Sequence, residues 1–128
     1  DLSSGNGNVS VTADSDDSTA GSDGALTMAD GASINSGSGT ITLLADENIV
    51  IGGLTSTYAS GTAITVTSDN GSITDAGDTD VDITASTSGG TVTLSALNTI
   101  GSVSGDAVYL DPSDSGYAGD PLETVILS

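Results

Sequence analysis

Short runs of alternating apolar and polar residues recur along the chain. They are clearest at residues 9–11, 41–43, 64–66 and 92–94, where Val, Ile or Leu stands at every second position. A period of two places all the apolar side chains of such a run on one face of an extended strand. The pattern therefore predicts an all-β chain that is built from many short strands.

These runs belong to a longer unit that repeats along the sequence. Each copy begins with Gly, continues into the alternating run, reaches a polar corner and ends at an apolar anchor. Asp, Asn and Gly suit the corner because they tolerate the backbone conformations of tight bends. The anchors predict a second short strand in each copy, and residues 54–58 and 81–83 predict a third in some copies. The anchors are Ile34, Ile49, Ile51, Ile73 and Ile100.

Repeats that cannot bury an apolar face alone are typical of solenoids, in which each coil packs on its neighbours. We therefore expect a right-handed parallel β-helix of roughly five to six coils, with coils about 4.8 Å apart. Two inward columns are predicted, the first from Leu26, Ile41, Ile64 and Val92, and the second from Met28, Leu43, Val66 and Leu94. A narrow interior of this kind suits branched aliphatic side chains, and the chain has three Tyr but no Phe or Trp.

An antiparallel β-sandwich of a bacterial surface protein is the alternative fold, since many short strands with Gly-rich turns suit it as well. Under either fold, the repeats occupy residues 1–105. Residues 106–128 form a second region, which is an acidic loop followed by a C-terminal strand. That strand either caps its own domain or pairs with a neighbouring subunit.

The repeat text resembles that of filamentous-haemagglutinin-like proteins and other large bacterial β-helical adhesins. The matching segments are GTITLLADENIVIGG, GTAITVTSDNGSITDAG and GGTVTLSALNTIGSVSG, at residues 39–53, 61–77 and 89–105. The resemblance covers about residues 7–105. It implies secretion, a place in an extracellular filament or on a bacterial or archaeal cell surface, and an adhesive role without catalytic residues.

The charge of the chain narrows the range of partners. There are 18 acidic residues and no Lys, Arg or His, so the formal net charge is -18. Binding to nucleic acid or to an anionic membrane surface needs cationic side chains, which are absent. No apolar stretch is long enough for a transmembrane helix, so membrane insertion is not expected. The charge favours hard cations with oxygen ligands, above all Ca²⁺.

Aspartates at the predicted corners are the candidate calcium ligands. Asp14, Asp30, Asp46 and Asp69 follow the inward residues of successive strands, so stacked coils would bring their like charges to about 5 Å, where a bound cation relieves the repulsion. The other reading is that they are solvated turn residues that bond to local backbone. Further acidic clusters add the remaining candidates, which are Asp16, Asp17, Asp78, Asp80, Asp111, Asp114 and Asp120.

Catalysis is not expected, because nucleophilic chemistry with a His, Lys or Cys base is impossible in this chain. The sequence favours a structural or adhesive module that associates with copies of itself through its solenoid ends or its terminal strand. The alternative is a calcium-dependent adhesin domain that binds a glycan or a protein. For sugar stacking the chain offers only Tyr58, Tyr109 and Tyr117.

Overall fold

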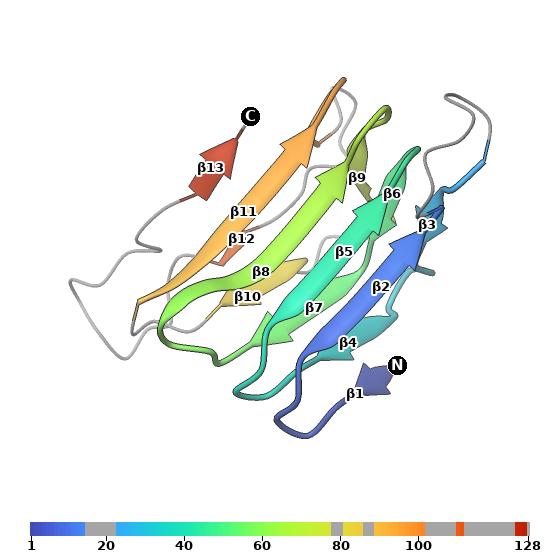
Figure 1. Cartoon of the computed structure of the whole chain (residues 1–128). Coiled ribbons are helices and arrows are strands. Elements are labelled where there is room, and N and C mark those ends of the chain that lie inside the picture. Colours follow the sequence, from blue (N-terminus) through green and yellow to red (C-terminus); the bar gives the residue numbers. More distant parts are fainter. Residues whose placement is uncertain (15–22, 78–80, 86–88, 102–109, 112–124, 128) are drawn as a thin grey trace.

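The structure, a computed structural model, describes residues 1–14, 23–77, 81–85, 89–101, 110–111 and 125–127. This part of the chain contains strands and turns but no helix, as the alternating sequence pattern predicts (Figure 1). For residues 110–111 and 125–127, only the backbone is described.

The strands form three sheets. Sheet A contains β1 (Leu2–Ser3), β4 (Ser33–Asn35), β7 (Gly53–Ser56), β10 (Ile83–Ala85) and β12 (Leu110–Asp111). Sheet B contains β2 (Val9–Ala13), β5 (Ile41–Ala45), β8 (Gly61–Ser68), β11 (Gly90–Ala96) and β13 (Val125–Leu127). Sheet C contains β3 (Leu26–Thr27), β6 (Ile49–Ile51) and β9 (Ile73–Asp75), and a parallel bridge from Ile73 to Ile100 extends it.

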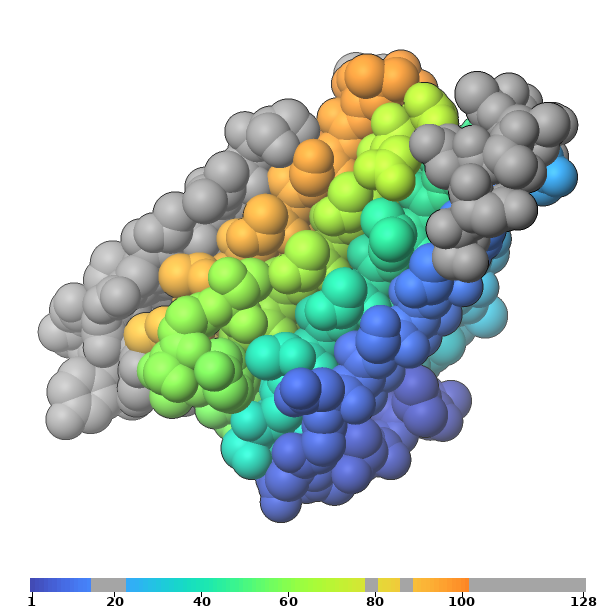
Figure 2. Space-filling view, in the orientation of Figure 1, coloured from blue at the N-terminus to red at the C-terminus, as the bar shows by residue number. Residues whose placement is uncertain are grey.

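All the strand ladders of the described residues are parallel. The chain visits sheets A, B and C in turn, so that each strand pairs with the strand of the same sheet in the next turn. Figure 2 shows the result as adjacent bands that follow the chain order. The arrangement is consistent with a parallel β-solenoid and confirms a parallel stack in place of an antiparallel sandwich.

The register places inward side chains directly over one another. Ile41 pairs with Ile64, and Ile64 pairs with Val92. In the second column, Leu43, Val66 and Leu94 are in register in the same way. All these side chains are at most 1% exposed. The predicted columns are therefore confirmed for these three turns.

The first turn differs from the prediction. Val9 and Val11 pair with Ile41 and Leu43, whereas Leu26 lies in sheet C opposite Ile49. Met28 follows β3 directly, and its N–H donates to the Val50 carbonyl of sheet C at 2.9 Å. The assignment of Leu26 and Met28 to the two sheet B columns was wrong. The connection from β2 to β3 spans residues 14–25, whereas that from β5 to β6 spans only 46–48. The short alternating run after this long connection was therefore mistaken for the first strand of a new repeat.

The anchor Ile34 also lies in another sheet than predicted. It is in sheet A, where it pairs with Leu2 and Leu54, and not in sheet C with Ile49 and Ile73. The predicted third strands at residues 54–58 and 81–83 overlap β7 and β10, which pair in the same sheet. The three sheets enclose one aliphatic core, to which Ile34, Ile51, Leu54, Ile73 and Ile83 all contribute.

The turns differ in length, which explains the irregular spacing of the sequence repeat. Paired residues of the first and second turns are 32 residues apart in sheets A and B but 23 apart in sheet C. Between the second and third turns the spacing is 20 to 24 residues, and between the third and fourth turns it is 27 to 29. The strands stay in register because the extra residues lie in the connections, which is where solenoids place their insertions.

Candidate functional site

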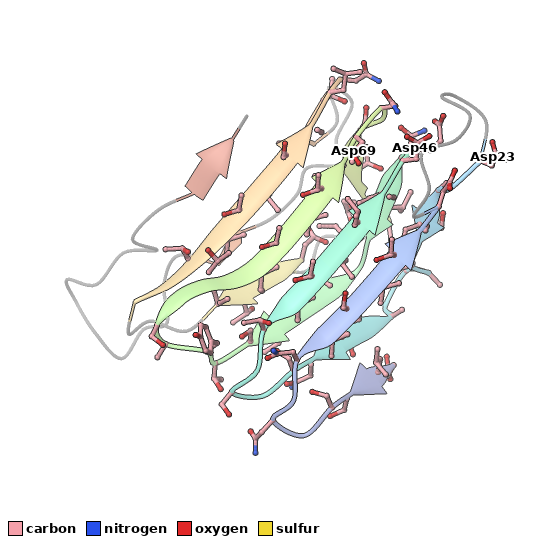
Figure 3. The ribbon with its side chains drawn as sticks, in the orientation of Figure 1. Asp23, Asp46 and Asp69 are labelled. Carbon is pink, nitrogen blue, oxygen red and sulfur yellow. The ribbon has the colours of Figure 1, made fainter. Side chains whose placement is uncertain are left out.

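Corner BC, the set of connections that lead from sheet B to sheet C, carries the aspartates predicted as a calcium column. Ala13, Ala45 and Ser68 are in register at the ends of β2, β5 and β8, and Asp14, Asp46 and Asp69 follow them directly. Figure 3 shows Asp46 and Asp69 at the same end of neighbouring strands. The register therefore brings these three predicted residues to one edge of the stack.

The three carboxylates have different environments. Asp69 is exposed, Asp14 is half-buried, and Asp46 is only 3% exposed. The Asp46 Oδ1 accepts a hydrogen bond from the Asn70 side-chain amide at 2.5 Å. Its Oδ2 is buried and has no hydrogen-bond partner. The column is thus not a row of equivalent carboxylates that face water.

Gly24 brings the first two turns of corner BC together. A Cβ at Gly24 would overlap the Asp14 Cβ and would lie 3.3 Å from the Asp46 Cβ. Gly24 has a φ of 94°, and Asp14 itself has a φ of 55°, in the left-handed region that Asp tolerates better than most residues. The backbone of Gly24 therefore fills the space beside both aspartates.

Neutral polar side chains link the successive turns of corner BC. The Asn48 Oδ1 accepts a hydrogen bond from the Ser72 N–H at 2.9 Å. The Thr99 hydroxyl lies 2.9 Å from the Ser72 hydroxyl, and the Asn98 amide donates to the Asn70 carbonyl at 3.2 Å. These bonds satisfy backbone and side-chain groups at the turns without any cation.

The remaining predicted ligands are not gathered at this corner. Asp30 lies in the turn after β3, between sheets C and A, so its assignment to one ladder with Asp14, Asp46 and Asp69 was wrong. The strand before Asp30 is β3 of sheet C, whereas the strands before Asp14, Asp46 and Asp69 belong to sheet B. Asp111 lies in β12 opposite Thr84, in sheet A. The others lie outside the described residues, and these are Asp16, Asp17, Asp78, Asp80, Asp114 and Asp120.

Within the described ranges there is no group of three or more acidic residues placed to hold a metal ion. The calcium column remains a prediction. The exposure of Asp69 agrees with the alternative reading, a solvated turn residue. The burial of Asp46 does not agree with that reading.

Corner CA, which joins sheet C to sheet A, holds two aspartates that the list of candidate ligands missed. Asp75 ends β9 and is 6% exposed, and Asp82 directly precedes β10 and is 2% exposed. Both oxygens of Asp75 are buried without a hydrogen-bond partner. The sequence did contain a signal, because Ile73-Thr-Asp75 repeats Ile49-Val-Ile51 with a carboxylate in the place of an inward isoleucine.

The tyrosines do not form a described sugar-stacking surface. Tyr58 is half-buried and packs against the aliphatic core, and its N–H donates to the Ser56 hydroxyl at 3.1 Å. Tyr109 and Tyr117 lie outside the described residues. The one ring whose position is known is therefore engaged with its own domain.

The first turn forms an edge of the stack. β1, β2 and β3 are each the last strand of their sheet among the described residues. The Val9 N–H donates to the Thr40 carbonyl at 2.8 Å, so the polar groups of Val9 and Val11 face β5. Since backbone groups alternate sides along a strand, those of Ser10 and Thr12 face away from the stack. Leu2 in β1 is 47% exposed.

The comparisons with known proteins give no identification, because no family model, curated protein or solved structure matches the chain. In the described part of the molecule, no helix has the length and apolar character needed to span a membrane. The function must therefore be argued from the chain itself.

Proposed function

We propose that this chain is a structural and adhesive module of an extracellular filament or large surface adhesin, and that it associates through the ends of its stack. On this proposal the fold is a right-handed parallel β-solenoid of roughly five to six coils. The right-handed sense rests on the strong preference for right-handed connections between parallel strands of one sheet. The bacterial or archaeal cell-surface setting rests on the resemblance of residues 7–105 to β-helical adhesins.

The edge formed by β1, β2 and β3 carries the proposal. Its outward backbone groups at Ser10 and Thr12 offer a row of donors and acceptors to a further parallel strand. The inward columns reach this edge as well, because Val9 is 7% exposed and Val11 is half-buried. A strand that pairs with β2 would therefore continue both a hydrogen-bond ladder and an aliphatic column.

Such pairing joins one end of a stack to the other end of the next, which gives an open filament and not a closed dimer. Repulsion between copies, each with a net charge of -18, opposes it at low ionic strength. We therefore expect assembly to increase with salt or divalent cations. The absence of basic residues is the observation behind this expectation.

Thr12→Pro tests the edge directly. Thr12 is exposed, and its N–H faces away from β5, so Pro at this position removes an edge donor and leaves the internal ladder intact. We expect the variant to fold, as judged by circular dichroism, but to assemble less than the wild type in sedimentation velocity and electron microscopy at moderate salt. Thr12→Ala is the matched control and keeps the N–H.

Two results would contradict the proposal. One is a wild-type chain that stays monomeric from low to high salt, with and without calcium. The other is a Thr12→Pro variant that is folded and assembles as well as Thr12→Ala, which would show that the β2 edge is not the contact.

A further inference from the structure

We propose that Asp75 and Asp82 bind a Ca²⁺ ion in corner CA, inside a single chain. This inference does not rest on the proposed function, because the site belongs to one molecule whether or not the molecule assembles. It differs from the calcium column predicted at corner BC, which involves other aspartates.

The environment of Asp75 is the first observation. Asp75 pairs with Ile51, whose side chain is fully buried in the core, and Ile73 two residues earlier is fully buried as well. The side chain of Asp75 therefore points inward, where an aliphatic residue stands in the turn before. Both of its oxygens are buried and have no partner, which is costly for a carboxylate.

Other buried polar side chains of the described residues show how this chain normally satisfies such groups. The Ser36 and Ser56 hydroxyls each donate to the Gly39 carbonyl at 2.7 Å. The Ser68 hydroxyl donates to the Glu47 carbonyl at 2.7 Å. Even Asp46 has the Asn70 amide at one oxygen. Among the described side chains, only Asp75 buries two carboxylate oxygens without a hydrogen-bond partner.

Asp82 is the second buried carboxylate of this corner. Ile83 pairs with Leu54, so Asp82 stacks on Gly53, and its carbonyl accepts a hydrogen bond from the Leu54 N–H at 2.6 Å. Asp75 stacks on Ile51, and Ile51 and Gly53 are separated only by Gly52. The Cα atoms of Ile51 and Gly53 are therefore at most about 7 Å apart. Asp75 and Asp82, which stack on these two residues, have backbones that are neighbours across the corner.

The backbone holds both aspartates in place. The Ala76 N–H donates to the Ile51 carbonyl at 2.9 Å, directly after Asp75. In the second turn, Gly52 alone connects Ile51 to Gly53. In the third turn, residues 76–81 connect Asp75 to Asp82. The two buried aspartates therefore stand at the base of an inserted connection.

The chain cannot neutralise these carboxylates with its own side chains, because it has no Lys, Arg or His. Both side chains are at most 6% exposed, and burying a charged carboxylate without a countercharge is costly. An external cation offsets this cost. Oxygen-only ligands favour Ca²⁺ over softer metals, and Ca²⁺ can complete its shell with backbone carbonyls and water besides the carboxylates.

The test is the thermal stability of the full chain in EDTA and in CaCl₂, followed by circular dichroism, with calorimetric titration of CaCl₂ for stoichiometry. We expect Ca²⁺ to raise the melting temperature by about 10 °C when its free concentration is 100 times Kd. Asp75→Asn should abolish most of this rise. Asp69→Asn, an exposed aspartate at corner BC, is the matched control and should keep it.

A second variant, Asp75→Ile, keeps the test decisive if Asp75→Asn fails to fold. It restores the aliphatic pattern of Ile51, so we expect it to melt higher than the wild type in EDTA and to show no response to Ca²⁺. The proposal is overturned if the wild type melts at the same temperature in EDTA and CaCl₂. It is also overturned if Asp75→Asn keeps the rise, or if Asp46→Asn abolishes it while Asp75→Asn does not.

Discussion

Corners BC and CA both bury aspartates, but Asp46 and Asp75 have different surroundings. At corner BC, Asp46 lies beside Gly24, and the Asn70 amide of the next turn bonds to its Oδ1. At corner CA, Asp75 stacks on the aliphatic Ile51 and has no hydrogen-bond partner at either oxygen. In a stack, the residues of the neighbouring turns therefore decide whether a buried corner aspartate has a hydrogen-bond partner. The local turn sequence alone does not decide it.

The largest effect should come from the core that both corners share. Ile64 is fully buried between Ile41 and Val92, so Ile64→Ala should lower the free energy of unfolding by about 2–5 kcal/mol. Urea unfolding measured by circular dichroism gives the value. Leu26→Ala is the comparison, since Leu26 lies at the edge and is 9% exposed. An equal loss in the two variants would contradict a core centred on the middle turns.

The backbone of corner CA offers a matched pair of glycines. A Cβ at Gly52 would overlap the Ala32 carbonyl oxygen, whereas one at Gly53 would meet its nearest atom, the Ser33 Cβ, at 3.6 Å. Gly52→Ala should therefore lower the free energy of unfolding by about 1–3 kcal/mol, the usual cost of overpacking. Gly53→Ala should change it little. Equal melting curves for the two variants would argue against this close packing of turns.

Removing the amide at corner BC should make Asp46 resemble Asp75. Asn70→Ala removes the partner of the Asp46 Oδ1, so that both oxygens lack one, which should cost about 1–3 kcal/mol of unfolding free energy in EDTA. Thermal melting of Asn70→Ala beside Asn98→Ala, which loses a more exposed bond to a backbone carbonyl, measures the difference. If Asn98→Ala costs as much, the Asp46 contact has no special weight.

The smallest effect is expected at the exposed position of the same column. Asp69→Asn should change the free energy of unfolding by no more than about 0.5 kcal/mol, as is usual for surface substitutions. Urea unfolding in EDTA gives the value. A change above about 1 kcal/mol would mean that the three aspartates of corner BC act together as the predicted column.

The sequence was sufficient to predict the parallel stack and much of its core. Alternation located β5, β8 and β11, and their aliphatic residues fixed the register because a slip of one residue would turn them outward. The first turn was misread because the long connection before Leu26 hides which sheet the next strand joins. When connections vary in length, the alternation of a run shows that it is a strand but not which of the three sheets it joins.

The candidate site was less predictable than the fold. The sequence marks Asp14, Asp46 and Asp69 as corner residues, but it does not show that Asp69 is exposed and Asp46 buried. That difference depends on Gly24 and Asn70, which come from other turns. Asp75 was not predicted as a ligand because each repeat was expected to end at its anchor, which here is Ile73. The signal was Ile51, which stands at the equivalent inward position one turn earlier.

The stacking also determines how the molecule responds to pulling. Every ladder bond joins one turn to the next, so tension along the stack is shared by the three sheets, whereas tension on the polypeptide itself peels one strand at a time. Turns of 20 to 32 residues would each release roughly 70–110 Å of contour length. A chain of this kind yields stepwise under load and lengthens before it breaks.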